Sequence, residues 1–166
     1  MSSVNHQNTK LVEAIAPANY NGSAASGNYV SLKAYEHCTI VIQTGAWAGG
    51  TAAVTISKAT DVGATNAEAM SFAYMYTNDG AATTDTLAKT AVTANTFNLD
   101  TANAMYVIEI DPADLGLNGT SGLPNDCISL QVATPGANND YYSALYILSG
   151  CRYAQGESPT PSALLD

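Results

Sequence analysis

Apolar and polar residues alternate with a period of two along most of the chain, which is the pattern of β-strands. The apolar segments are rich in β-branched and aromatic residues, and Gly, Asn, Asp and Pro clusters separate them. The segments expected as strands are 10–18, 29–35, 38–45, 51–59, 68–78, 86–99, 104–110, 126–134 and 140–150. Consecutive antiparallel strands in this number predict an all-β, two-sheet β-sandwich, with a jelly roll as the specific expectation.

Two segments carry more local detail. In 68–78, alternation would align Met70, Phe72, Tyr74 and Tyr76 on one face of a single strand, whereas 86–99 alternates weakly and we expect a break at Ala94-Asn95. One short helical turn is predicted within 111–119. Asp111 would cap it, Pro112 would open it, and Gly116 or Gly119 would end it.

The last expected strand is apolar on both faces. One face holds Tyr141, Ser143, Leu145 and Ile147, and the other holds Tyr142, Ala144, Tyr146 and Leu148. A strand at the surface of a small sheet protein normally has one polar face. The pattern therefore predicts that more of this chain, or a partner, covers the second face.

The two ends differ from the middle, so we expect an N-terminal arm (1–10), a sandwich domain (11–154) and a C-terminal arm (155–166). The first ten residues are polar, and the last twelve contain two prolines and an apolar ending, Leu164 and Leu165. Such segments are either frayed ends or arms that reach a neighbour. Extended at about 3.3 Å per residue, the C-terminal arm could carry both leucines on the order of 35 Å to another subunit.

Composition narrows the function classes. The chain has 14 acidic and 5 basic residues and a net charge of −9. Because the basic residues are scattered, direct binding of nucleic acid is not expected. The first residues lack the basic and apolar segments of a secretory leader, and no stretch approaches the ~18 apolar residues of a membrane span. We therefore expect no secretory leader, no membrane association and folding in a reducing cytoplasm. The three cysteines are then expected as buried thiols.

Candidate chemistry is sparse. His37 and Cys38 are neighbours, but adjacent strand residues point to opposite faces and cannot share a proton. Cys38, Cys127 and Cys151 lack zinc-ligand spacing. Glu109 and Asp111 would share a strand face, which raises a glycosidase-like carboxylate pair or a calcium site, although Asp111 is already expected to cap the helical turn. Nucleotide-binding glycine motifs are absent. We therefore expect no catalytic, cofactor-binding or metal-binding residues.

Aromatic residues are the remaining feature. Ten tyrosines accompany two phenylalanines and one tryptophan, and tyrosine suits interfaces because it combines apolar area with a hydroxyl that tolerates water. Trp47 lies in a Gly-rich loop. It either folds back on the end of the sandwich, anchors in a partner's pocket, or offers a stacking platform for a sugar.

The segments "LKAYEHCTIVIQTG", "EAMSFAYMYTNDGAATTDTLAKTAVTANTFNLDTANAMYVIEIDPADL" and "ALYILSGCRYA" resemble small structural proteins of tailed bacteriophages. The resemblance spans about residues 32–154 and concerns overall pattern. It implies a capsid decoration (cement) protein, without catalytic residues, that binds the outside of the head, bridges subunits of the major capsid protein and forms a homo-oligomer, often a trimer. Assembly would take place in the host cytoplasm.

Under this interpretation a sister subunit would cover the face of Tyr142, Ala144, Tyr146 and Leu148. The interface candidates are Trp47, Tyr142, Tyr146, Leu148, Leu164 and Leu165. Two alternatives stay open: a virion β-sandwich module of a spike or fibre that binds host glycans or a receptor, and another structural subunit of the head or tail.

Overall fold

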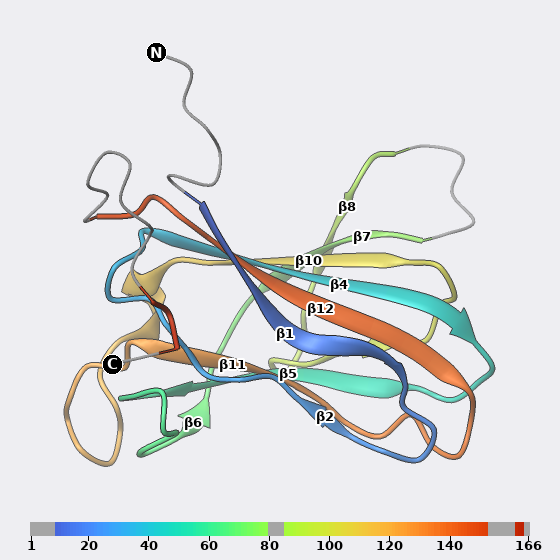
Figure 1. The fold of residues 1–166 in the computed structure, drawn as a ribbon, viewed down its shortest axis with the longest axis horizontal. Coiled ribbons are helices and arrows are strands. Elements are labelled where there is room, and N and C mark those ends of the chain that lie inside the picture. The colour runs from blue at the N-terminus through green and yellow to red at the C-terminus, as the bar shows by residue number, and fades with distance from the viewer. Residues whose placement is uncertain (1–8, 80–84, 153–161, 165–166) are drawn as a thin grey trace.

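The fold is two antiparallel β-sheets packed face to face (Figure 1). The computed structural model describes residues 9–79, 85–152 and 162–164. Sheet A has the strand order β1-β12-β4-β10-β7-β8, with bounds β1 Thr9–Asn19, β12 Asp140–Ser149, β4 His37–Trp47, β10 Met105–Ile110, β7 Tyr74–Asn78 and β8 Ala88–Ala91. Sheet B has the order β2-β11-β5-β6, with β3 also paired to β11 and β9 to β5. Its bounds are β2 Ala25–Ser26, β3 Val30–Ser31, β11 Cys127–Val132, β5 Ala52–Ala59, β6 Glu68–Ala69 and β9 Phe97–Leu99.

The strand order is that of a jelly roll. If β2 with β3, and β6 with β9, each count as one interrupted strand, eight strands build the sandwich. The first of these pairs with the eighth (β1 with β12), the second with the seventh (β2 and β3 with β11), the third with the sixth (β4 with β10) and the fourth with the fifth (β5 with β6 and β9). A long antiparallel hairpin wrapped into two sheets gives this pairing. The predicted sandwich and its jelly-roll connectivity are therefore confirmed.

The β7–β8 hairpin is an insertion within one strand of sheet B. β6 pairs with the end of β5 through Ala69 and Ser57, and Met70 donates its backbone amide to Ile56 at 2.9 Å. The chain then leaves, adds β7 and β8 to the edge of sheet A beyond β10, and returns as β9, where Phe97 pairs with Val54. The expectation of one strand over 68–78 is thus wrong, because its two halves belong to different sheets.

Local backbone chemistry explains the other boundaries. The predicted break before β9 is present, with Ala94 and Asn95 both in the left-handed region (φ 55° and 59°). The helical turn spans Pro112–Leu115 as a 3-10 turn; Asp111 accepts the Ala113 amide at 2.8 Å, and Gly116 ends the turn. The segment 29–35 forms strand only at Val30–Ser31, because the chain turns after Leu32, whose amide still donates to the Asp126 carbonyl at 2.7 Å.

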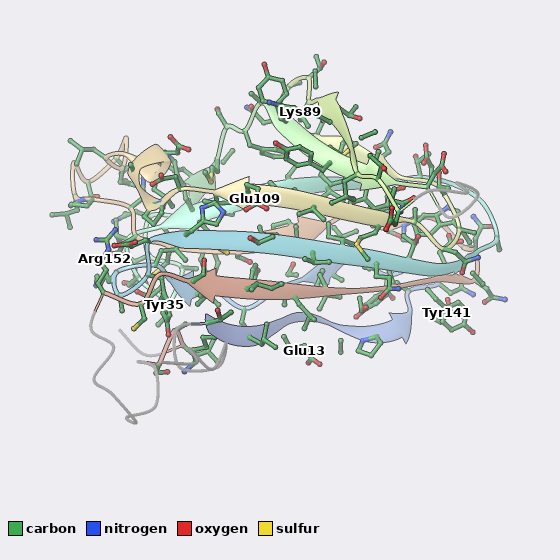
Figure 2. All side chains as sticks on the ribbon, turned by 90° about the horizontal axis from the view of Figure 1, so that it is seen from above. Glu13, Tyr35, Lys89, Glu109, Tyr141 and Arg152 are labelled. Carbon is green, nitrogen blue, oxygen red and sulfur yellow. The ribbon has the colours of Figure 1, made fainter. Side chains whose placement is uncertain are left out.

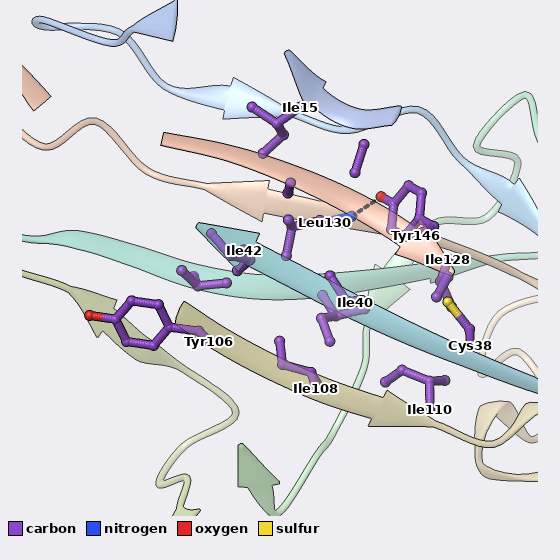
Figure 3. Packing of buried hydrophobic residues seen from close by; sticks show 14 of the residues in the cluster. Ile15, Cys38, Ile40, Ile42, Tyr106, Ile108, Ile110, Ile128, Leu130 and Tyr146 are labelled. Carbon is purple, nitrogen blue, oxygen red and sulfur yellow. Dashed lines mark hydrogen bonds between the residues drawn. The ribbon is translucent and has the colours of Figure 1, made fainter. Parts of the chain in front are cut away.

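The core fills the space between the two sheets (Figure 3). Sheet A contributes the inward residues of β4, β10 and β12, and sheet B those of β5 and β11. Its largest fully buried side chains include Tyr35, Leu32, Ile40, Ile42, Ile56, Leu99, Ile108, Ile110, Leu115, Ile128, Leu130 and Tyr146.

One hydrogen bond joins the sheets across this core. The backbone amide of Leu130 on β11 donates to the hydroxyl oxygen of Tyr146 on β12 at 2.7 Å (Figure 3). The chain bulges between β2 and β3 opposite Leu130, so the tyrosine hydroxyl supplies the acceptor that a continuous neighbouring strand would have offered. Gly27 lies at this bulge, where a Cβ atom would come within 2.6 Å of the hydroxyl oxygen. Burial raises the pKa of Tyr146 far above its ordinary value.

Candidate functional site: the outer face of sheet A

The structure reverses the expected roles of the two faces of the last strand. Tyr142, Tyr146 and Leu148, expected at an interface, are buried between the sheets with 2%, 0% and 0% exposure, and Ala144 lies with them. The alternation of the sequence distinguishes the two faces of the strand. It does not determine which face points inward, because both faces are apolar. The inward face places the Tyr146 hydroxyl on the Leu130 amide, a partner that only the opposite sheet provides.

The outward face of β12 belongs to an apolar row that crosses sheet A. Cross-strand pairing aligns Leu145 with Val41, Val41 with Val107, and Val107 with Tyr76. We call Leu145, Val41, Val107 and Tyr76 the apolar row; it runs from β12 to β7. Figure 2 looks onto this face of the sheet.

Two further apolar side chains widen the row at the β1 edge. Ile147 lies beside Leu11 of β1. Leu11 is 65% exposed and Leu145 is 43% exposed. Two leucines this exposed on neighbouring strands form an exposed apolar patch, whereas Val107 at the centre of the row is only 7% exposed.

A polar cluster adjoins the row. Glu109 of β10 contacts His37 and accepts a hydrogen bond from Thr39 at 2.9 Å. His37 thus faces outward toward Glu109, whereas Cys38 is fully buried, as the alternation of the strand predicts. The two neighbours point to opposite sides of the strand, so His37 and Cys38 do not form a cysteine–histidine pair.

The other candidate chemical groups are also apart. Asp111 caps the 3-10 turn while Glu109 accepts a hydrogen bond from Thr39 of β4, so each carboxylate has a structural partner of its own. Within the described residues, no three His, Cys, Asp or Glu side chains are placed to hold a metal ion. Burial, and secondarily Glu109, raises the pKa of Cys38. Cys127 is buried and Cys151 half-buried, and no disulfide joins any two of the three.

Trp47 lies against the end of the sandwich. Its ring is 6.3 Å from the ring of Tyr142, and its Nε1 donates to the Gly50 carbonyl at 3.1 Å. Tyr142 also stacks on Tyr20 with a ring separation of 4.3 Å. The half-buried indole thus packs on its own chain, which is the first of the three possibilities for this residue.

Asp140 fixes the loop that carries Trp47. Its carboxylate is fully buried, and Oδ1 accepts the amides of Ala48 and Gly49 at 2.6 and 3.3 Å. Sequence reasoning missed this residue, since nothing in the alternation distinguishes a buried aspartate at a strand start from a solvated one.

The C-terminal candidates are only partly described. Ala163 is fully buried and its carbonyl accepts the Ser31 amide at 2.8 Å, so Ser162–Leu164 return to β3 of the same chain. Leu164 is 45% exposed. Leu165, and most of the two expected arms (1–8, 153–161 and 165–166), lie outside the described residues.

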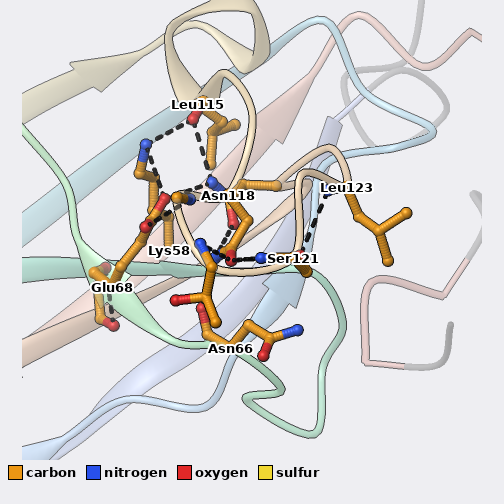
Figure 4. Close-up of polar contacts among 11 residues, drawn as sticks. Lys58, Asn66, Glu68, Leu115, Asn118, Ser121 and Leu123 are labelled. Carbon is orange, nitrogen blue, oxygen red and sulfur yellow. Dashed lines mark hydrogen bonds and ion pairs between the residues drawn. The ribbon is translucent and has the colours of Figure 1, made fainter.

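The loop 116–125 is held by a buried polar network (Figure 4). Asn118 is 2% exposed; its amide group donates to the Asn66 carbonyl at 2.6 Å and accepts the backbone amides of Thr120 and Ser121 at 3.0 Å. Glu68 accepts the Gly119 amide. The asparagine, part of a glycosylation-like sequon, is thus structural.

A charged pair lies beneath the same loop. Lys58 lies 3.3 Å from Glu68 and donates to the Leu115 carbonyl at 2.7 Å. The Gly119 amide first, then Asn125 and Lys58, hold the pKa of Glu68 below its usual value.

A cleft lies between the inserted hairpin and β10. Its volume is about 460 Å³, and Phe72, Tyr74, Lys89, Glu109 and Asp114 are among its lining residues. Lys89 lies over the Tyr74 ring, with Nζ 3.9 Å from the ring centroid. These residues supply no nucleophile with an adjacent base, so the cleft has no recognisable catalytic arrangement.

Among the described residues there is no helix of the length and apolar character that a membrane crossing requires.

Comparison with known proteins gives only distant likenesses. No protein-family model matches the sequence, and no curated protein matches it. The SPBc2 prophage-derived protein YomS, a crystal structure, aligns with a TM-score of 0.49 and 10% identity, covering 86% of this chain and 94% of its own. A structure of infectious bursal disease virus, Gx strain, aligns with a TM-score of 0.38 and 15% identity; the match covers 95% of this chain and 35% of the viral chain. A Broad Bean Stain Virus structure aligns with a TM-score of 0.23 and 13% identity, covering 87% and 96% of the two chains.

Proposed function

We propose that this chain is a structural subunit of a virion, of the decoration type, which binds the outside of a bacteriophage head and bridges subunits of the major capsid protein. Leu145 of the apolar row and the neighbouring Leu11 carry the proposal, because they are exposed on sheet A of a sandwich whose core is already complete. The sequence resemblance to phage decoration proteins supports the same conclusion. The role is one of binding and stabilisation, with no reaction to catalyse.

Self-association is the first part of the proposal. We assign the apolar row, with Leu11 and Ile147, to contacts between copies of the chain in a homo-oligomer, a trimer by the family resemblance. Covering a leucine that is about half exposed contributes roughly 1 kcal/mol, so Leu11 and Leu145 together contribute roughly 2 kcal/mol on each copy. The half-buried Val41, Ile147 and Tyr76 add smaller contributions when the next copy covers them. The net charge of −9 on each copy opposes association, and the row itself contains no charged residue.

The oligomer is tested by light-scattering mass in solution. Wild type is expected at three times the 17.1 kDa of the chain, and the association should tighten as salt screens the repulsion between copies. Leu145→Lys should lower the mass to that of one chain. Leu117→Lys is the matched control, since Leu117 is 66% exposed but lies in the loop 116–125. A monomeric wild type at all concentrations would overturn the self-association.

Binding to the head is tested separately. Heads purified from a virus that lacks this gene should burst at a lower temperature than complete heads, and added protein should restore the difference. Density for the subunit on the outer surface in a reconstruction of the virion would establish its position. Density in the tail instead would favour the other structural role, and heads of equal stability with and without the protein would refute the stabilising one.

A further inference from the structure

A hollow of about 370 Å³ lies on the outer face of sheet A, beside the apolar row, at the end of the sheet where β12 begins. Its lining comes from β1, β12, β4 and the turn before β10. On β12, Ser143 and Tyr141 lie on the same outer face as Leu145 and precede it in the sequence. On β4, Gln43 lies on the same outer face as Val41 and comes after it. Tyr141 lies near one end of the sheet, away from Glu109 (Figure 2).

Strand irregularities create this hollow. The pairing of β12 with β4 shifts register between Asp140 and Tyr142, and the pairing of β1 with β12 shifts between Ile15 and Ala18. Bulges bend a strand and redirect its side chains, and they are frequent beside binding sites. Gly45 keeps the floor low, since a Cβ atom there would come within 3.3 Å of the Tyr141 Cβ.

Four uncommitted polar side chains that reach the surface line the hollow, and a fifth, Tyr142, has a buried hydroxyl without a hydrogen-bond partner among the described residues. The amides of Gln43 and Asn103 and the hydroxyls of Ser143 and Tyr141 make no hydrogen bond to other described residues. By contrast, two other asparagine side chains nearby pair with each other: the Asn19 amide donates to the Asn139 side-chain oxygen at 2.9 Å. The backbone of Asn103 is itself fixed, because its amide donates to the Gly45 carbonyl at 2.9 Å.

The chemistry of this lining selects a class of ligand. Amides and hydroxyls offer both donors and acceptors, and Tyr141 (45% exposed) adds an aromatic surface at the same place. No charged residue lines the hollow, so it has no cation to hold a phosphate, a sulfate or a carboxylate. A neutral polyhydroxylated molecule can satisfy all four groups and lie against the ring.

We propose that this hollow binds a neutral saccharide, with Gln43, Asn103 and Ser143 as hydrogen-bonding residues and Tyr141 as the ring against which the sugar packs. The site is separate from the apolar row and goes beyond the structural role proposed above. An oligomer would present several copies of it, so a weak single contact would become strong binding to a surface with many glycans.

The test is binding of simple sugars to the full chain, followed by NMR. The probes are the methyl glycosides of glucose, galactose, mannose and N-acetylglucosamine, with sialic acid as the charged comparison. At least one neutral sugar is expected to shift the backbone resonances of Gln43, Ser143 and Tyr141, and sialic acid is not. If no neutral sugar shifts them, or if sialic acid shifts them equally, the proposal is wrong.

Variants then assign the residues. Gln43→Ala and Tyr141→Ala should each weaken binding of that sugar roughly threefold to tenfold, as expected for one lost contact of this kind. Asn98→Ala is the matched control, because Asn98 is an exposed amide on β9 of the other sheet. Unchanged affinity in both test variants, with the thermal midpoint preserved, would remove the hollow as the site. Head binding does not enter these measurements, so the outcome is independent of the decoration function.

Discussion

Tyr146→Phe is the most direct test of how the two sheets are held together. The substitution removes a single oxygen atom and keeps the ring that fills the core. In the wild type that oxygen accepts the Leu130 amide at 2.7 Å, and both residues are fully buried. In the variant, the Leu130 amide has no acceptor on the neighbouring strand, because β2 and β3 are interrupted at that position.

The cost follows from burying an unsatisfied donor. Leaving a buried amide without an acceptor costs about 1 to 3 kcal/mol. For a domain of this size, each kcal/mol shifts the thermal midpoint by roughly 2 to 4 °C. We therefore expect the free energy of unfolding of Tyr146→Phe to fall by about 1 to 3 kcal/mol, and the midpoint to fall by roughly 2 to 12 °C.

Thermal and denaturant unfolding followed by circular dichroism measure the effect. Tyr141→Phe is the control, since it removes the hydroxyl of an exposed tyrosine and should change the free energy of unfolding by less than about 0.5 kcal/mol. The reasoning is refuted if the two variants have the same stability. In that case the Leu130 amide must find another acceptor, and the hydroxyl would not hold the sheets.

Three further predictions concern the same framework. Burial raises the pKa of Tyr146 in the fold, as it does the pKa values of Tyr142 and Cys38. Because the unfolded chain releases these protons near pH 9 to 10, stability should fall as pH rises above that range, by up to about 1.4 kcal/mol per pH unit for each group, and the smaller slope of Tyr146→Phe in denaturant midpoints would isolate the share of Tyr146. Asn118→Ala should lower the free energy of unfolding by roughly 2 kcal/mol and open the loop 116–125 to proteolysis, because three backbone groups lose the buried side chain that binds them; a loop that resists protease as in wild type would contradict this. Gly50→Ala should destabilise the fold by much more than Gly116→Ala in a thermal melt: both have positive φ, but a Cβ at Gly50 would lie 2.2 Å from the Pro135 carbonyl oxygen, whereas Gly116 faces open space. Equal midpoints for the two variants would show that the loop around Gly50 moves aside freely.

Much of the fold could be predicted from the sequence because alternation acts locally. The strands β4, β5, β10, β11 and β12 lie where the period-two pattern placed them, and Asp111 caps the helical turn as expected. The jelly-roll strand order is one of several connectivities that the same number of strands allows. Pairing between distant strands decides it, and no local pattern contains that information.

The site was predicted less well, for a physical reason. Alternation identifies two faces of a strand but not which one meets the opposite sheet, so Tyr142, Tyr146 and Leu148 were assigned outward. The split of 68–78 between two sheets has a similar origin, because an apolar run suits either sheet. The row on sheet A arises from register across four strands, and no single segment shows it.

The insertion between β6 and β9 has a consequence for engineering. The chain leaves the β5 ladder after Met70, whose amide bonds to Ile56, and rejoins it at Phe97, which pairs with Val54. The backbone pairing of the eight-stranded framework therefore closes without β7 and β8, but Met75 of β7 is a core residue and β7 covers the edge of β10. An epitope or affinity tag grafted at that junction must therefore keep or replace both the Met75 side chain and the strand that pairs with β10.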